Sequence, residues 1–448
     1  MLNVKEAEAR AAALVEAATK AGADAADVLY VGDASTGVQV RLGVLEDIER
    51  SEGETIGLRF FIGRKSATIS SSDLSGEALA ALVERAAAMA KEAPEDPYAG
   101  LAPESMLLTG PGVDVDGDDG CDPAPSDLRD RALALEDAAR AVPGVTNSEG
   151  AGVSAGRSVI ALATSHGFCR GYSTSGYSAS ASVIAGEGAA MQRDYDSHNV
   201  RHYADLEPPE TIGRRAGERA VRRLDPGKLA SGVMPVVFDP RVGGGLVGHL
   251  IGAIKGSAIA RQTSFLVGRE GEAIFPDAIT IVDDPHRPRG LRSKPFDGEG
   301  LRTAPRKLIE SGRLTGWLMD SASARQLGQS PTGHATRGAG GAPGVSATNV
   351  ALLPGALSPD ALIADIRLGL YITELIGHGV NEVTGDYSRG ASGFIIENGE
   401  IAGAVQEITV AGNLIDMYRT LAAADDLEYR RGVNVPTLRV EGMTVAGA

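Results

Sequence analysis

Short runs of alternating apolar and polar residues, joined by turns that contain glycine, constrain this chain more than any other feature of its sequence. Residues 38–42 read VQVRL, residues 56–62 read IGLRFFI and residues 65–70 read KSATIS. A period of two places alternate side chains on opposite faces of a strand, so these runs predict a meander of antiparallel strands. Glycine supplies 58 of the 448 residues, nearly twice its usual share of about 7%, which agrees with many turns between strands.

Helical patterns in the N-terminal half predict a cover for these strands. The apolar spacing predicts amphipathic helices over residues 5–21 and 208–224, Ser75 can cap a third helix, and Ser126 opens a fourth. The stretch 92–126 contains six prolines and many aspartates without a sustained period, so we interpret it as a connection.

The pattern changes near residue 226, after which short apolar strands alternate with glycine-rich connections. We therefore predict an α+β protein, with N-terminal antiparallel sheets covered by helices and a β-rich C-terminal domain. The predicted domains are residues 1–225, composed of two subdomains joined by the loop near 92–126, and residues 226–448.

The composition excludes several classes of function. Lysine and arginine number 43 against 59 acidic residues, for a formal net charge of −16, which disfavours direct binding to nucleic acid. Only Cys121 and Cys169 occur, without metal-site or disulfide-scaffold spacing, so a reducing cytoplasm is expected. We expect no export signal and no membrane-spanning segment, because charges interrupt every apolar window.

The segment 241–266, RVGGGLVGHLIGAIKGSAIARQTSFL, raises two chemical possibilities. Its glycines follow the G-x-G-x-x-G order of a dinucleotide loop, but the surrounding strands do not form a βαβ unit. A zinc helix needs a second imidazole and a glutamate, and His249 has neither beside it. His198 and His202 lie four residues apart on a predicted strand, where they would be about 13 Å apart, too far for one ion.

Residues 377–401, GHGVNEVTGDYSRGASGFIIENGEI, gather polar groups in a loop between strands. Such a loop can form a binding surface, or Asn, Asp and Gly can simply hold a β-turn network; both possibilities stay open. The candidate residues for a peptide groove or an interface are His249, His378, Asn381, Asp386, Ser388 and Arg389.

The run GVNEVTGDYSRGASGFIIENGEIAGAVQEITVAGN (379–413) and the run RQTSFLVGREGE (261–272) closely resemble the TldD/PmbA family, once labelled modulators of DNA gyrase. The resemblance covers nearly the whole chain. In that family, TldD-like subunits carry an HExxxH helix and a C-terminal cysteine as metal ligands. PmbA subunits, also called TldE, lack these ligands and pair with the first kind to form a cytoplasmic metallopeptidase acting on unfolded peptides.

The chain resembles the PmbA kind, because His249 stands alone in the place of the metal helix and both cysteines precede residue 170. The resemblance implies no catalytic or metal-binding residue in this chain, zinc in a TldD-like partner, and unfolded peptide as substrate. Self-association without that partner is left open. His334 stands where the family pattern favours asparagine, which leaves its contacts open.

Two alternatives belong to other classes of function. One is a free-standing metal-dependent hydrolase that uses unrecognised ligands such as His249 with His378. The other is a regulatory protein that binds gyrase directly.

Overall fold

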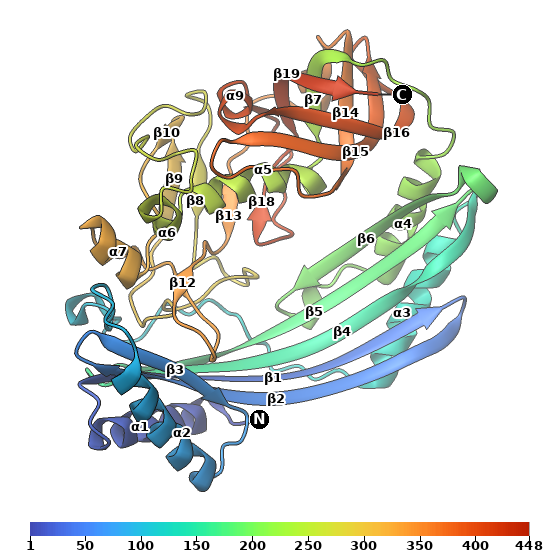
Figure 1. Cartoon of the computed structure of the whole chain (residues 1–448). Helices are drawn as coiled ribbons and strands as arrows, with labels where there is room; N and C mark the ends of the chain where they lie inside the picture. The colour runs from blue at the N-terminus through green and yellow to red at the C-terminus, as the bar shows by residue number, and fades with distance from the viewer. Residues whose placement is uncertain (448) are drawn as a thin grey trace.

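The computed structural model describes residues 1–447 and confirms the predicted α+β class (Figure 1). In the N-terminal half, the predicted runs lie within longer strands of one six-stranded antiparallel sheet, in the order β3-β2-β1-β4-β5-β6. The strands are β1 (Ala25–Arg41), β2 (Val44–Ile62), β3 (Lys65–Ser71), β4 (Val145–Thr164), β5 (Cys169–Ala185) and β6 (Gln192–Val200). The predicted meander is therefore confirmed, with β1 and β2 beginning well before their short predicted runs and β3 matching its run closely.

Helices cover one face of this sheet at its two ends (Figure 1). They are α1 (Val4–Lys20), α2 (Gly76–Glu92), α3 (Pro125–Arg140) and α4 (Pro209–Arg222), with short 3-10 turns at Glu104–Met106, Gly188–Ala190 and Tyr203–Asp205. The first two helices and the last two enclose separate apolar clusters against the same long strands. Ser75 caps α2 by accepting from Ala78 N. The helix expected to open at Ser126 begins one residue earlier, because Pro125 occupies its first position, where proline is pre-organised.

The C-terminal half is rich in short strands and has one helix of several turns, α5. Its elements are β7 (Gly232–Phe238), α5 (Pro240–Ala253), α6 (Gly256–Ala260), β8 (Ile281–Asp283), β9 (Arg306–Glu310), β10 (Arg313–Leu314), α7 (Ser321–Leu327), β11 (Ala335–Thr336), β12 (Gly344–Val345), β13 (Val350–Leu352), α8 (Pro359–Ile363), β14 (Leu368–Ile376), β15 (Asp386–Glu397), β16 (Glu400–Asn413), α9 (Leu414–Arg419), β17 (Ala422–Ala423), β18 (Val433–Asn434) and β19 (Leu438–Ala446). One sheet has the order β16-β15-β14-β7-β19-β17, and an added β16–β19 pairing closes it into a ring. A second sheet has the order β10-β9-β8-β13-β18.

The two halves of the chain meet through buried charges. Asp27 on β1 accepts hydrogen bonds from Arg59 on the adjacent β2 and from Arg337, which follows β11 in the C-terminal half. All three side chains are at most 8% exposed. Residue 225 lies between α4 and β7, and the proposed division into domains there stays a prediction.

The structure answers the open question about His334. The His334 ring is buried, with Nε2 3.0 Å from Asp283 Oδ2 and Nδ1 2.9 Å from Thr332 Oγ1. Asp283 also accepts from the backbone N–H and hydroxyl of Thr348. His334 is thus a core residue whose two ring nitrogens are both satisfied. Along residues 1–447, no helix is both long and apolar enough to cross a membrane.

Candidate functional site

The glycine-rich segment forms the helix α5 rather than a phosphate loop. Asp239 caps the helix by accepting from Arg241 N at 2.8 Å, and Pro240 occupies its first position. The glycines of the G-x-G-x-x-G pattern therefore lie inside helical turns, where they form no open loop. A Cβ on Gly243 would stand 3.1 Å from Val435, so this glycine allows α5 to pack closely against the C-terminal sheets.

His249 on α5 faces Tyr387 on β15. Their ring centroids are 6.1 Å apart in an edge-to-face arrangement. Burial lowers the pKa of His249, and Arg389 lowers it further, while Glu382 opposes the change. His249 is therefore held as a neutral imidazole near neutral pH. Burial also raises the pKa of Tyr387 to about 12, and its hydroxyl has no hydrogen-bond partner among residues 1–447.

The donor set around His249 does not fit a catalytic metal ion. The residues that follow it on α5 at the next turn, Ala253 and Ile254, carry no ligand atom. The nearby Arg389 guanidinium would repel a divalent cation. No group of three or more His, Cys, Asp or Glu side chains is arranged to hold a metal within residues 1–447.

The structure separates the predicted residues of the 377–401 run into two kinds. Asn381 Oδ1 accepts from Val383 N at 3.0 Å, and Asp386 accepts from Thr384 Oγ1 at 2.7 Å, so these two side chains stabilise the turn. His378 and Ser388 lie exposed on the loop and on β15. Of the five candidates in this run, Arg389 is the one that acts on the pKa of His249, and Glu382 from the same run opposes it.

His198 and His202 serve separate contacts. His198 Nδ1 accepts from Glu207 N at 3.2 Å, whereas His202 Nε2 lies 3.0 Å from Asp116 O. β6 ends at Val200, between the two histidines. The prediction that one strand carries both histidines is therefore wrong for His202, and the two side chains make separate contacts.

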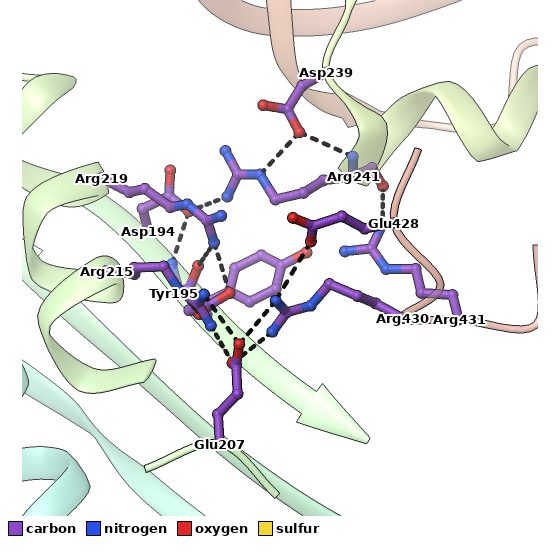
Figure 2. Close-up of polar contacts among 11 residues, drawn as sticks. Asp194, Tyr195, Glu207, Arg215, Arg219, Asp239, Arg241, Glu428, Arg430 and Arg431 are labelled. Atoms are coloured by element: carbon purple, nitrogen blue, oxygen red, sulfur yellow. Dashed lines mark hydrogen bonds and ion pairs between the residues drawn. The ribbon is translucent and has the colours of Figure 1, made fainter. Parts of the chain in front are cut away.

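A cleft of about 380 Å³ lies where β6 and α4 meet the start of α5 and residues 426–435 (Figure 2). Arginines dominate its polar lining, and no candidate from the sequence is among them. The arginines in the lining are Arg215, Arg219, Arg241, Arg430 and Arg431. Tyr195, from β6, projects among them and is 40% exposed (Figure 2).

Most of these arginines are neutralised inside the cleft. Asp196 accepts from Arg215 and from Arg219, each at 2.7 Å. Glu207 accepts from both Arg215 and Arg430, in the latter case at 2.7 Å. Burial opposes the ionisation of Glu207, but the two guanidiniums outweigh it and lower its pKa to about 2.

Arg241 and Arg431 complete the lining. Arg241 Nη1 donates to Asp194 Oδ1 at 2.8 Å, which joins α5 to β6. Arg431 Nη1 donates to the backbone oxygen of Arg241 at 2.6 Å (Figure 2). The only trace of this cleft in the sequence is a set of arginine pairs, at 214–215, 222–223 and 430–431, in an otherwise acidic chain.

Three family models together match most of the chain. Residues 26–90, 118–224 and 231–447 match domain 1, the central domain and the C-terminal domain of the PmbA/TldA metallopeptidases. The long antiparallel sheet and the β-rich C-terminal half are thus the architecture of a metallopeptidase family. The chain belongs to the PmbA/TldD family.

Individual relatives agree with this assignment. The chain is 37% identical to the metalloprotease PmbA of Escherichia coli O157:H7, over 100% of this chain and 99% of that protein. A crystal structure from Bacteroides thetaiotaomicron, described as a proposed modulator of DNA gyrase, superposes with a TM-score of 0.92 at 27% identity, covering 100% of both chains. TldE from Thermococcus kodakarensis shares the fold, with a TM-score of 0.87 at 22% identity over 97% of this chain and 99% of that chain.

Proposed function

We propose that this chain is the non-catalytic, PmbA/TldE-like subunit of a two-subunit cytoplasmic metallopeptidase that acts on unfolded peptides and proteins. A TldD-like partner would hold the zinc ion and the glutamate that accepts the proton from the attacking water. This chain would supply a wall of the peptide groove.

The surroundings of His249 carry the proposal. A catalytic zinc site needs three protein ligands and an open position for water. Here the single imidazole packs against the Tyr387 ring and lies close to the Arg389 cation. TldD-like subunits use a C-terminal cysteine thiolate as a metal ligand. The two cysteines of this chain, Cys121 and Cys169, are exposed in its N-terminal half and cannot supply that ligand to a site on α5.

Peptide recognition by this subunit would rely on its sheets. An extended peptide can add to an exposed sheet edge through main-chain hydrogen bonds, which give affinity with little dependence on sequence. β6 is the candidate strand, because it stands last in the order of the six-stranded sheet, with β5 as its neighbour. This mode suits unfolded chains of varied sequence.

The test is reconstitution with a TldD-like subunit from the same host. We expect each purified chain alone to be inactive on casein, the pair to be active, and zinc to follow the partner in metal analysis. Replacing the partner's HExxxH glutamate by glutamine should abolish cleavage. His249→Ala and His378→Ala in this chain should change the pair's activity by less than about threefold, because neither residue would touch the metal.

Two results would contradict the proposal. One is stoichiometric zinc together with peptide cleavage by this chain alone, lost in His249→Ala by the hundredfold or more expected of a missing ligand. The other is capture of gyrase by this chain at physiological salt in the absence of a TldD-like subunit, which would favour the regulatory alternative.

A further inference from the structure

We propose that the arginine-lined cleft between β6, α4 and residues 426–435 binds a carboxylate group of a peptide, with Arg431 as its principal contact. The carboxylate could belong to the chain end or to an acidic side chain, and both present the same chemistry to a guanidinium. The inference rests on the proposed function only for the identification of the ligand as a peptide.

The balance of charges in the cleft singles out Arg431. Arg215, Arg219, Arg241 and Arg430 each have a carboxylate partner within 4.0 Å. Within the described residues 1–447, Arg431 has no such partner, and its one side-chain hydrogen bond goes to the backbone oxygen of Arg241. A guanidinium carries five N–H donors in a planar fork. Arg431 therefore has donors left for a ligand.

The field around Arg431 favours an anion. Burial lowers the pKa of the Arg431 guanidinium, and Arg241 and Arg219 act in the same direction, against the opposite influence of Tyr195 and Asp239. A bound carboxylate would offset this crowding of positive charge through a charge-assisted contact, and the exposed Arg431 can be reached from solvent. The hydrogen bond to the backbone oxygen of Arg241 holds Arg431 in place.

The carboxylates of the cleft are already engaged, which argues against a cation as the ligand. Asp196 and Glu207 each accept from two arginines. Asp426 accepts from the backbone N–H and the hydroxyl of Thr437, each at 2.8 Å. Glu428, at the rim, is 71% exposed and lies 3.6 Å from Arg430. No carboxylate is left buried without a cation or donor to attract a positive ligand.

The cleft also offers main-chain groups to a peptide. The backbone oxygen of Tyr195 accepts from Arg219 and its N–H donates to Asp194 Oδ1 at 2.7 Å, so these groups point away from β5 and are already engaged. In an antiparallel ladder every second residue presents its backbone groups to the same side, so Ser197 and Asn199 should also do so. Both residues line the cleft. A peptide added to β6 would thus pass beside Arg431.

A smaller cavity of about 100 Å³ extends the same site. It shares Arg219, Asp239, Arg241 and Tyr371 with the cleft. Thr373 also lines it, and in the described part of the chain the buried Thr373 hydroxyl has no hydrogen-bond partner. This hydroxyl could donate to a ligand carbonyl or carboxylate, since buried polar groups are rarely left unpaired.

The experiment measures peptide binding to the full chain without any partner, by fluorescence anisotropy at low salt. The probe is a labelled hexapeptide with no acidic side chain, prepared with a free C-terminus, with a C-terminal amide, and as an amide with one internal glutamate. We expect the free acid or the glutamate peptide to bind at least about tenfold more tightly than the plain amide, as one charge-assisted hydrogen bond allows. Which of the two binds identifies the source of the carboxylate.

Arg431→Gln should abolish this preference, and Arg431→Lys should retain part of it. Arg419→Gln is the matched control, because Arg419 is 55% exposed on α9 and pairs with Asp416 within its own helix. Equal binding of all three peptides, no binding of any, or an unchanged preference in Arg431→Gln would overturn the proposal. If inorganic phosphate at the same concentration as the peptide displaced the bound peptide, the cleft would be a general oxyanion site, and the peptide assignment would be refuted. This binding assay contains no partner subunit. A negative result would therefore refute the carboxylate site without bearing on the reconstituted peptidase of the proposed function.

Discussion

Replacing Asp27 by alanine should strongly destabilise the protein, because Asp27 neutralises two buried arginines at once. Asp27 is 2% exposed, Arg59 8% and Arg337 1%. Burial opposes ionisation of Asp27, but Arg337 and Arg59 together hold its pKa below the ordinary value. Removing one partner of a buried pair costs about 3–5 kcal/mol, chiefly because a charge is left buried without compensation. Because Asp27→Ala leaves two buried guanidiniums without their carboxylate partner, its cost should fall at the upper end of that range.

The urea midpoint and the Tm are measured at pH 7, with circular dichroism to detect unfolding. For a cooperative unit of roughly 200 residues, a loss of about 4 kcal/mol corresponds to a fall in Tm of about 10 °C. Asp130→Ala is the matched control, since Asp130 is 66% exposed and pairs with its neighbour Arg129; it should shift stability by less than about 0.5 kcal/mol. If the free energy of unfolding of Asp27→Ala lies within about 1 kcal/mol of that of the native chain, the buried triad contributes far less than its geometry implies, and the reasoning fails.

Two further predictions concern a buried acid and a crowded glycine. Burial is the larger cause, and Asp297 the second, of a rise in the pKa of Glu299 to about 7. The protonated carboxyl therefore makes its full contribution to stability below about pH 4.5. That contribution is lost as the pH rises through 7. Glu299→Gln should therefore gain about 3 kcal/mol at pH 8.5 and only about 1 kcal/mol at pH 5, and an equal Tm shift at both pH values would contradict this. Gly393→Ala would place a Cβ 1.9 Å from the backbone oxygen of Tyr371, so it should lower stability by roughly 2–4 kcal/mol. Gly403→Ala, with open space around its Cβ, should be tolerated, and similar Tm values for both would refute the steric argument.

The fold was largely predictable because it follows local patterns. The strand-forming patterns of residues 38–42, 56–62 and 65–70 specify strands whatever they pair with, and the helix over residues 5–21 follows from its apolar stripe. The full length of β2, which runs from Val44 to Ile62, was not predictable, because residues 44–53 are exposed on both faces and show no buried period. Pairing with β1 along its whole length holds that segment as a strand.

The arginine cleft was not predictable, because it forms only in the tertiary structure. Arg215 and Arg219 come from α4, while Arg430 and Arg431 lie more than 200 residues later. Nothing in either local pattern indicates that Glu207 joins them. The same holds for His334, whose partner Asp283 is 51 residues away. Long-range ion pairs of this kind leave no period in the sequence.

The segment that best identifies the family, residues 379–413, reports on packing more than on chemistry. A Cβ on Gly379 would stand 1.8 Å from the backbone oxygen of Ser388, so only glycine lets the loop approach β15 so closely. Asn413 donates to Thr384 O at 3.0 Å and ties the same loop to β16. These contacts hold the loop against β15 and β16, beside Tyr387, whose ring faces His249 on α5. A family signature of this kind is compatible with both a metal-binding and a metal-free subunit, and the residues on α5 around His249 must decide between them.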